Sequence, residues 1–548
     1  MRALVATILI AGCTPGWKQT PHDQLFQYEP PVALVAKPSS YDPTEWWTKT
    51  ETLFVRPLGK LLSPGTYVKT VVGGPPARDV NRLGQVPDSS WFVNRIGRRA
   101  YSVAEALQGA AQDGGLAPGT LDVISGKIDG VSAGFVLRDS AGTVWFLKLD
   151  HPAFPELSTS AEVITSRLLW LAGYRVPSMR VIDIDRSRFV LSPTARTKDR
   201  YNRSIPLTAR ALANLLANTN PDKDGRIRVL ISRQAPGENL GPFSYQGRRL
   251  DDPNDLIPHE HRRSLRALWL FSAWVNNTDT RDANSLNVFR PVAGKLGVVD
   301  HYLLDFGDAF GSTGLGEKAA VEGWTYLLDW RAIGRNLVSL GFRYPRYRHV
   351  QRSPVRSIGL FESKIFIPAR WHPELPNPAF DQRTSADLFW AASILARIQP
   401  DHVRAAVAAG NYREDGAVAY VVDTLLARRK KLLEYALAGY LPLDRPRTDG
   451  FVLRLDNLRA LGGLAVTGPF HYVVRWNRTR GADRELARGT AVATDAEVVI
   501  DLSTIRAHRD AVADDPFITV ELSQRGGDVL AVHLRWSGDR LVPVAVDR

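Results

Sequence analysis

Two acidic residues and an asparagine stand in the order that phosphoryl transfer from a metal-bound nucleotide requires. Asp279 is followed five residues later by Asn284, and Asp305 begins the tripeptide Asp-Phe-Gly further along the chain. In such a set, the first carboxylate orients an attacking hydroxyl group and accepts its proton. The amide oxygen and the second carboxylate hold Mg²⁺ against the phosphates, because hard oxygen ligands suit this cation. The spacing therefore predicts a catalytic loop with a metal site beside it.

A lysine and a glutamate occur upstream, in the order needed to hold the phosphates of a nucleotide. Lys148 lies near the end of the apolar run 144–149, which predicts a buried strand, and an ammonium group buried there needs a partner. Glu162 opens the segment 162–173, whose apolar periodicity and terminal glycine predict a helix. An ion pair with this glutamate would aim Lys148 at the α- and β-phosphates. Alternatively, Thr159 and Glu162 form only a capping box at the start of the helix.

Taken together, these residues resemble the atypical protein-kinase-like fold. The resemblance rests on Lys148, Glu162, the Asn-Thr-Asp that ends at Asp279, Asn284 and the Asp-Phe-Gly that begins at Asp305. It is closest to HipA-type serine/threonine kinases, and the spore-coat CotH kinases and the secretory-pathway Golgi kinases are similar in outline. The resemblance covers roughly residues 101–440 and is carried by motifs.

The resemblance implies a role for each of these residues. Asp279 is expected to be the catalytic base, Asn284 and Asp305 the ligands of Mg²⁺, and Lys148, held by Glu162, the clamp on the phosphates of ATP. The implied activity is transfer of a phosphoryl group to a hydroxyl of an unknown protein or small molecule. The chain departs from the usual pattern in two places: Asn-Thr-Asp replaces His-Arg-Asp, and no Ala-Pro-Glu follows the second carboxylate.

The remaining nucleotide contacts are expected in two places. No Gly-x-Gly-x-x-Gly precedes the lysine, but segment 126–134 is rich in glycine, and Gly130 and Gly134 could let backbone amides approach a phosphate. An ordinary hairpin turn explains the same glycines equally well. The strand predicted at 226–232, which ends at Ser232, is the expected hinge between two lobes, where the adenine of a kinase commonly stacks.

The N-terminus predicts a lipid-anchored protein of the bacterial cell envelope. A minimal positive start and the apolar residues 3–10 precede a small-residue pattern that ends at Cys13, as in a bacterial lipobox. Cys13 is the only cysteine of the chain, so its position where diacylglycerol attachment needs a thiol favours lipidation over a cytosolic protein with an apolar start. We expect a signal peptide at 1–12 and a polar, proline-rich tether to the membrane at 13–40.

Basic charge is the main compositional bias of the chain. The formal net charge is +13, mostly from scattered arginines, with one dense cluster at 428–431. For a lipoprotein the simplest anionic neighbour is the membrane surface. The sequence contains no recognisable nucleic-acid-binding module, so no specific nucleic-acid partner is expected, and the protein is expected to be a monomer.

The order of strand and helix signals predicts an α+β fold with a two-lobed protein-kinase-like core and a C-terminal β-sandwich module. An irregular extension at 41–100 leads into the kinase-like N-lobe at 101–232. A helical C-lobe at 233–445 follows, and it includes a buried helix at 265–275 that ends at the catalytic loop. Alternating apolar segments beyond residue 446 predict the strands of the β-sandwich module at 446–548.

Three functions remain compatible with these residues. The first is a membrane-anchored kinase using Mg²⁺ and ATP, which the intact motif residues favour. The second is a non-catalytic pseudokinase or envelope scaffold, because ATP is expected to be scarce outside the bacterial cytoplasm. The third is a nucleotidyl (AMP) transferase, which uses the same metal ligands with the nucleotide inverted. A zinc site at His259 and His261 is not expected, since their spacing places them on different faces of a helix and surface polarity explains them better. His301 is either a core histidine or a neighbour of the site.

Overall fold

A computed structural model gives the structure of the chain. It describes residues 32–41, 74–126, 133–199, 203–217, 219–329, 333–334, 337–339, 342, 345–466, 468–477, 483–491, 493–494, 496–509, 515–524 and 527–548. The predicted signal peptide, Cys13 and Gly130 lie outside these residues. Within the described residues, no helix combines the length and the apolar character that crossing a membrane needs.

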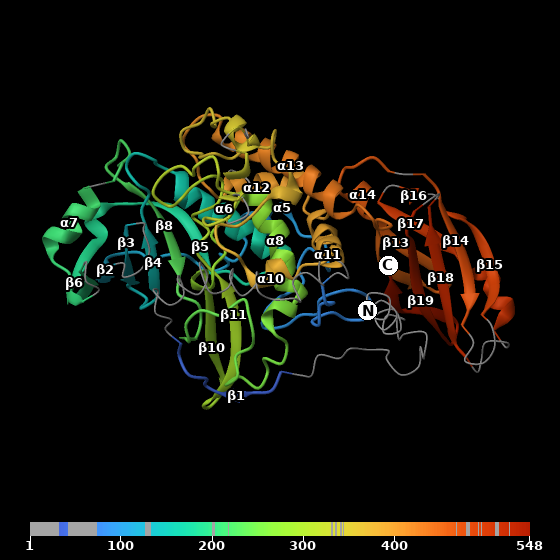
Figure 1. The fold of residues 1–548 in the computed structure, drawn as a ribbon. Coiled ribbons are helices and arrows are strands. Elements are labelled where there is room, and N and C mark those ends of the chain that lie inside the picture. Colours follow the sequence, from blue (N-terminus) through green and yellow to red (C-terminus); the bar gives the residue numbers. More distant parts are fainter. Residues whose placement is uncertain are drawn as a thin grey trace. The chain divides into compact units, whose positions relative to one another are not determined.

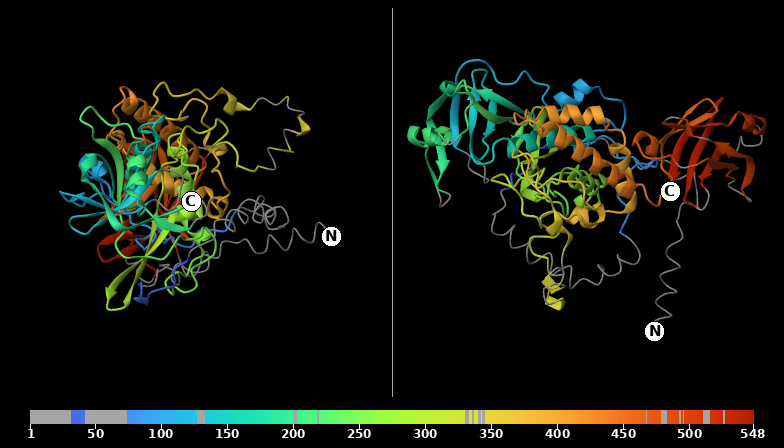
Figure 2. Two further views of the ribbon diagram at one scale, coloured as in Figure 1. Left: turned by 90° about the vertical axis from the view of Figure 1, so that its left-hand side faces the viewer. Right: turned by 90° about the horizontal axis from the view of Figure 1, so that it is seen from above.

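The protein is α+β, as predicted, and it divides into two compact units. The first unit contains Val80–Gln85 and Leu437–Arg548. The second, unit 2, is built mainly from Val86–Ala436 and contains every residue of the predicted catalytic motifs. Figures 1 and 2 show the elements of each unit.

A seven-stranded sheet forms one part of unit 2 (Figure 1). Its strand order is β5-β8-β4-β3-β2-β6-β7, and all neighbours are antiparallel except the parallel pair β2 and β6. Apolar side chains that alternate along these strands form a core against one face of the sheet, as expected for strands buried on that side. The strands are β2 (Leu121–Gly126), β3 (Gly134–Asp139), β4 (Val144–Lys148), β5 (Met179–Ile184), β6 (Phe189–Lys198), β7 (Ser204–Pro206) and β8 (Ile227–Arg233).

Helix α6 (Leu157–Ala172) is buried along its whole length and lies against β5 and β8. It begins five residues before the predicted start, because Asp150 caps it: one carboxylate oxygen accepts the amide hydrogens of Ser158 and Thr159 at 3.0 and 2.9 Å. Thr159 therefore lies inside the helix, and the proposed capping box with Glu162 is not formed. The other helices of this part are α5 (Val103–Gln108), α7 (Ala209–Ala217) and the 3₁₀ helix η3 (Arg186–Arg188).

The buried guanidinium of Arg228 fixes the start of α6 to its surroundings. It donates to the Asp150 carboxylate at 3.0 Å, to the Ser160 hydroxyl at 2.6 Å and to the carbonyl of Gly410 at 2.6 Å. It also contacts the hydroxyl of Thr159. One side chain from β8 thus joins the sheet, the helix and a loop more than 180 residues further along the chain.

A smaller sheet, of order β1-β11-β10-β9, follows in unit 2 (Figure 1). Its core is the antiparallel hairpin of β10 (Ser285–Ala293) and β11 (Leu296–Leu303), flanked by β9 (Glu238–Asn239) and β1 (Val35–Ala36). The chain therefore passes from β8 in the large sheet to β9 in the small one within a few residues. Because β1 pairs with β11 and Ser39 bonds to Asp251 at 2.6 Å, the tether predicted at 13–40 does not extend to residue 40.

The remaining described part of unit 2 combines helices with long irregular segments. The predicted helix before the catalytic loop is confirmed as α8 (Arg263–Val275), and it is buried on all sides after its first residue. The elements are η4 (His259–His261), η5 (Asp282–Asn284), η6 (Arg346–His349), η7 (Pro368–Arg370), α10 (Pro378–Asp381), α11 (Ser385–Leu395), α12 (Pro400–Ala408) and α13 (Ala417–Ala436).

Three of the four cations in the dense basic cluster at 428–431 bond to carbonyls of the same unit. Arg428 is buried and donates to the carbonyls of Trp274, Glu362 and Ala273, and Arg429 bonds to the carbonyl of Ala396 at 2.9 Å. Lys431 donates to three further carbonyls. Arg428, Arg429 and Lys431 thus satisfy carbonyls of helix ends and loops inside the unit, while Lys430 is exposed.

Two histidines of unit 2 are core residues. His259 is buried and bonds to the Asp255 carboxylate at 2.7 Å, so its assignment to surface polarity was wrong. His301 stacks on Trp91 with ring centroids 3.5 Å apart, which settles its alternatives in favour of the core. Trp91, from the irregular segment before α5, is therefore a packing anchor.

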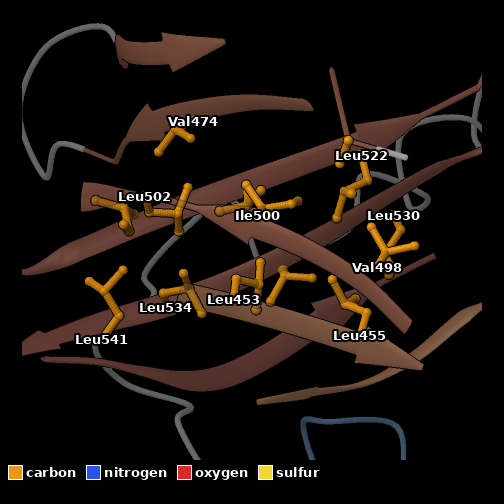
Figure 3. Packing of buried hydrophobic residues seen from close by; sticks show 14 of the residues in the cluster. Leu453, Leu455, Val474, Val498, Ile500, Leu502, Leu522, Leu530, Leu534 and Leu541 are labelled. Atoms are coloured by element: carbon orange, nitrogen blue, oxygen red, sulfur yellow. The ribbon is translucent and has the colours of Figure 1, made fainter. Parts of the chain in front are cut away.

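The first unit consists of two antiparallel sheets that share one apolar core. One sheet has the order β12-β13-β17-β16 and the other β15-β14-β18-β19-β20. Alternate residues of both sheets enter the core, including Leu453 and Ile500 from the first sheet and Leu522 and Leu534 from the second (Figure 3). The elements are β12 (Leu443–Asp449), β13 (Val452–Asn457), α14 (Leu458–Leu461), β14 (Phe470–Trp476), β15 (Arg484–Ala491), β16 (Ala493–Thr494), β17 (Glu497–Asp501), η8 (Ser503–His508), β18 (Phe517–Ser523), β19 (Val529–Ser537) and β20 (Arg540–Asp547).

Replacing Arg228 should destabilise unit 2 strongly. In Arg228→Met, Asp150 loses its buried countercharge while the carbonyl of Gly410 loses a donor, which costs about 3–5 kcal/mol for a broken buried pair. Thermal unfolding followed by intrinsic fluorescence measures the effect. Arg226→Met is the matched control, because Arg226 is on the same strand end and its ion pairs are exposed, so its effect stays below about 1 kcal/mol. Equal melting temperatures for the two variants would contradict the role given to Arg228.

Candidate functional site

The predicted catalytic motif begins where helix α8 ends. Asn276 takes the left-handed conformation, with φ of 57°, and the amide of Asn277 bonds back to the carbonyl of Ser272 at 2.9 Å. Asparagine tolerates this conformation better than most residues, so it ends the helix and turns the chain into the loop that carries Asp279. The Asn276 side chain accepts a hydrogen bond from the indole of Trp371 at 2.9 Å, which holds the turn in place.

The β10–β11 hairpin brings the two predicted metal ligands to the same end of the small sheet. Asn284 immediately precedes β10, and Asp305 follows β11 by two residues. Ser285 pairs with Leu303, and the amide of Leu304 donates to the carbonyl of Asn284 at 2.9 Å. The Asn284 amide nitrogen donates to the backbone carbonyl of Asp279 at 2.8 Å, so that asparagine also fixes the catalytic loop.

Lys148 joins three separate segments of unit 2. Its ammonium group bonds to both carboxylate oxygens of Glu162 at 2.8 Å and to the carboxylate of Asp305 at 2.8 Å. The predicted contact between the strand lysine and the helix glutamate is thus confirmed. Burial alone would lower the pKa of Lys148, but the charges of Asp305 and Glu162 raise it above its usual value, so the group stays protonated.

The two carboxylates around Lys148 differ in their exposure. The Glu162 side chain is 2 % exposed, whereas that of Asp305 is 47 % exposed. Glu162 therefore serves the lysine from inside the unit, and Asp305 faces solvent and can also reach a ligand. Asp305 has φ of 55°, a conformation that non-glycine residues adopt rarely and that is often found at functional positions.

The Asp-Phe-Gly tripeptide packs against the helix that carries Glu162. The carbonyl of Gly307 accepts a hydrogen bond from the hydroxyl of Ser158 at 3.3 Å. A Cβ atom at Gly307 would lie 2.5 Å from that hydroxyl oxygen and 3.5 Å from a carboxylate oxygen of Glu162. A larger residue at this position would require the Ser158 hydroxyl to move and would break its bond to the Gly307 carbonyl, so this contact links α6 to the Asp-Phe-Gly segment.

Asp279 has the properties of a base near neutral pH. Its side chain is mostly buried and accepts a hydrogen bond from Arg281 at 2.9 Å. Burial raises the pKa of Asp279 to about 6, and the charges of Asp308 and Glu374 also raise it, while Arg281 and Asn284 oppose the shift. A carboxylate with such a pKa can accept a proton from a hydroxyl group more readily than an ordinary aspartate.

A second lysine, Lys318, lies at the site and was not predicted from the sequence. Lys318 is buried, pairs with the Asp308 carboxylate at 2.8 Å and donates to the carbonyl of Asn276 at 3.2 Å. It also contacts the hydroxyl of Thr278, which itself donates to Asp308 at 3.0 Å. Lys318 lies in the segment that follows Asp305 and ties that segment to the catalytic loop. No spacing or periodicity marks it, because Asp308 precedes it by ten residues and Thr278 by 40, and neither interval belongs to a recognised motif.

The predicted nucleotide-binding residues are placed only in part. Gly134 is the first residue of β3 and pairs with Lys148, and a Cβ atom there would lie 2.1 Å from the carbonyl oxygen of Leu147. Its bare backbone thus lets β3 approach the lysine strand. Ser232 pairs with Phe146, and Leu230 pairs with Lys148, so Ser232 and Lys148 lie on the same face of the sheet. The segment between β2 and β3 joins antiparallel strands, which is compatible with both readings of the glycine-rich loop.

The predicted metal site has few protein ligands. Among the described residues, no three histidine, cysteine, aspartate or glutamate side chains form a cluster that could hold a metal ion. The predicted set of one asparagine and one aspartate is smaller, and Mg²⁺ needs only one or two protein carboxylates when phosphates and water complete its shell.

Comparison of the chain with protein-family models, with curated proteins and with solved structures gives no match in any of the three. What the site can do therefore follows from its own geometry.

Removing the Lys318 ammonium should loosen the catalytic loop. In Lys318→Met, Asp308 loses its ion pair and Thr278 loses a contact, so amide hydrogen exchange of peptides covering 276–284 is expected to rise at least about tenfold. Hydrogen exchange followed by mass spectrometry measures this. Lys318→Arg should recover part of the protection, and Lys364→Met, which changes an exposed lysine of the same unit, should leave it unchanged. Unchanged exchange in Lys318→Met would show that the loop is held by other contacts.

Proposed function

We propose that unit 2 is a kinase-like phosphotransferase that moves a phosphoryl group from Mg-ATP to a hydroxyl acceptor. The observation that carries the proposal is the contact of Lys148 with both Glu162 and Asp305, at 2.8 Å each, from three segments spread over more than 150 residues. An ion pair made only for stability would not need an exposed third member, and Asp305 is that member.

The order of the elements supports the same proposal. Lys148 lies on β4, the third strand of the large sheet along the chain, as the phosphate-binding lysine of protein kinases lies on the third strand. The next helix supplies the glutamate, and the catalytic loop and the Asp-Phe-Gly follow in the order found in kinases. The large sheet and the helical part of unit 2 would then be the two lobes, with the passage from β8 to β9 as the hinge.

The residues present fit a Mg-nucleotide. The Asn284 amide nitrogen is used by the carbonyl of Asp279, which leaves the amide oxygen as the atom suited to a hard cation. Asp305 adds an accessible carboxylate two residues after β11. Asn284 and Asp305 would hold Mg²⁺, which when bound neutralises charge on the phosphates and orients them for in-line transfer.

The chain's own groups have separate tasks in the proposed reaction. Lys148 gives up its contact with Asp305 and binds phosphate oxygens of the nucleotide instead. Glu162 keeps its ion pair with the Lys148 ammonium group and holds that group toward the phosphates. Asp279 orients the acceptor hydroxyl and accepts its proton, with Arg281 holding the carboxylate. Lys318 and Asp308 keep the loop that carries Asp279 against the segment after Asp305.

Two substitutions should separate binding from transfer. Asp305→Asn is expected to abolish Mg²⁺-dependent ATP binding, measured by calorimetry, because a ligand charge is lost from an accessible position. Asp279→Asn should bind ATP normally and lose about 10²–10⁴-fold in ADP release, since only the positioned base is removed. Asp401→Asn, an exposed acid of unit 2, is the control and should match the parent. If Asp279→Asn and Asp305→Asn both behaved like the parent, the assigned roles would be wrong.

Mass spectrometry of the protein and its products after incubation with Mg²⁺ and ATP distinguishes the three candidate functions. Phosphoryl transfer gives ADP and a phosphate on the acceptor, nucleotidyl transfer gives pyrophosphate and a bound AMP, and a scaffold leaves ATP intact.

The activity should fall below about pH 6. Asp279 acts as a base only when deprotonated, and burial raises its pKa to about 6. The value of kcat/KM for ATP, which reports the free enzyme, should therefore drop about tenfold per pH unit below that pKa and level off above it. A profile without an acidic limb between pH 5 and 7 would contradict the assignment of Asp279 as the base.

A further inference from the structure

Segment 327–352 of unit 2 is here called the arm, and its described residues include large apolar side chains that are exposed. Phe342 is 90 % exposed, Val338 88 %, Leu337 70 % and Leu327 65 %. In both views of Figure 2, the described parts of the arm, drawn in yellow, stand away from the rest of unit 2. Side chains of this kind are costly to leave in water when several lie in one short segment, so their grouping suggests a partner that buries them.

The arm is also strongly basic. It contains six arginines and a single acidic residue, Asp329. Arg346 and Arg348 are exposed on the short helix η6, and the Arg352 side chain is 81 % exposed. This distinguishes the arm from the cluster at 428–431, whose charges satisfy carbonyls inside the unit. The arm combines exposed arginines with exposed aliphatic and aromatic side chains.

Both ends of the arm are attached close to the candidate site. The amide of Leu327 donates to the carbonyl of Glu374 at 2.8 Å, and the amide of Glu374 donates to the carbonyl of Thr278, next to Asp279, at 2.9 Å. At the other end, Arg352 pairs with Glu317, the neighbour of Lys318, at 3.7 Å. A surface bound by the arm would therefore lie near the catalytic loop.

We propose that the arm docks unit 2 on a membrane surface that contains anionic phospholipids. Arginines are attracted to the headgroups, and the leucine, valine and phenylalanine side chains enter the boundary of the acyl region. The phosphates of a nucleic acid would pair with the arginines, but a nucleic acid would leave the aliphatic side chains exposed to water. A second copy of the arm would bring two strongly basic segments together, which like-charge repulsion opposes. The proposal does not depend on phosphoryl transfer or on a lipid at Cys13.

Vesicle sedimentation tests the proposal. The full-length chain with Cys13→Ser, which cannot be acylated, is mixed with vesicles of phosphatidylcholine alone or with phosphatidylglycerol added. The parent is expected to sediment with the anionic vesicles at low salt and to be released by salt, because the attraction is screened. Leu337→Ser/Val338→Ser/Phe342→Ser should weaken the partition at least about tenfold. Arg346→Gln/Arg348→Gln should weaken it by about fivefold for each arginine.

Matched controls change the same residue types elsewhere in unit 2. Leu250→Ser/Leu256→Ser removes exposed leucines, and Arg98→Gln/Arg203→Gln removes exposed arginines. Both controls should sediment like the parent, and loss of binding in either would overturn the assignment to the arm. The proposal also fails if the parent does not sediment with anionic vesicles, or if it binds single-stranded RNA and does not bind vesicles. It fails equally if the substitutions in the arm change the oligomeric state of the protein, measured as its molar mass in solution, and leave vesicle binding unchanged.

Discussion

The ion pairs of Lys148 with Glu162 and Asp305 are the interactions on which the arrangement of unit 2 depends. A buried cation is tolerated only when its countercharges are held in place, and here they come from helix α6 and from the segment after β11. Glu162 can serve only if α6 starts where it does, and that start is set by Asp150 and Arg228. Asp305 can serve only because the β10–β11 hairpin delivers it beside Asn284. One charge thus imposes a common geometry on the sheet, the helix and the hairpin.

The charges around the catalytic loop are arranged as neighbouring pairs. Lys148 stands between Glu162 and Asp305, Arg281 meets Asp279, and Lys318 meets Asp308. Each of these ion pairs joins two segments or two positions of the loop that carries Asp279. Ion pairs and hydrogen bonds therefore hold this loop in place. The proposed ligand is itself highly charged, and such a site can exchange protein countercharges for ligand charges without exposing a buried ion. This property is independent of the identity of the acceptor.

The sequence predicted those features that depend on local pattern. The strand of Lys148, the helix of Glu162, helix α8 and several strands of the first unit follow from apolar periodicity and turn residues. The start of α6 was missed because its cap, Asp150, precedes the helix by seven residues and leaves no spacing signal. The burial of Arg428 was missed for a related reason, because its partners are backbone carbonyls far away in sequence. Lys318 was missed because its intervals to Asp308 and Thr278 match no recognised motif. A basic cluster that is exposed at the surface cannot be distinguished, from sequence alone, from a basic cluster that bonds to carbonyls inside the unit.

The hairpin that carries the candidate metal ligands has an outer edge that would be open to pairing with any extended chain. Three separate segments cover it: β1 pairs at Leu296 and Gly297, the carbonyl of Ser90 takes the amide of His301, and the carbonyl of Arg175 takes the amide of Leu303. Open strand edges promote intermolecular pairing and aggregation. Two of these segments, β1 and the residues around Ser90, precede helix α5 in the chain. They protect this edge of the sheet from pairing with other chains, and a fragment designed to begin at α5 would expose the edge close to the loop that carries Asp279.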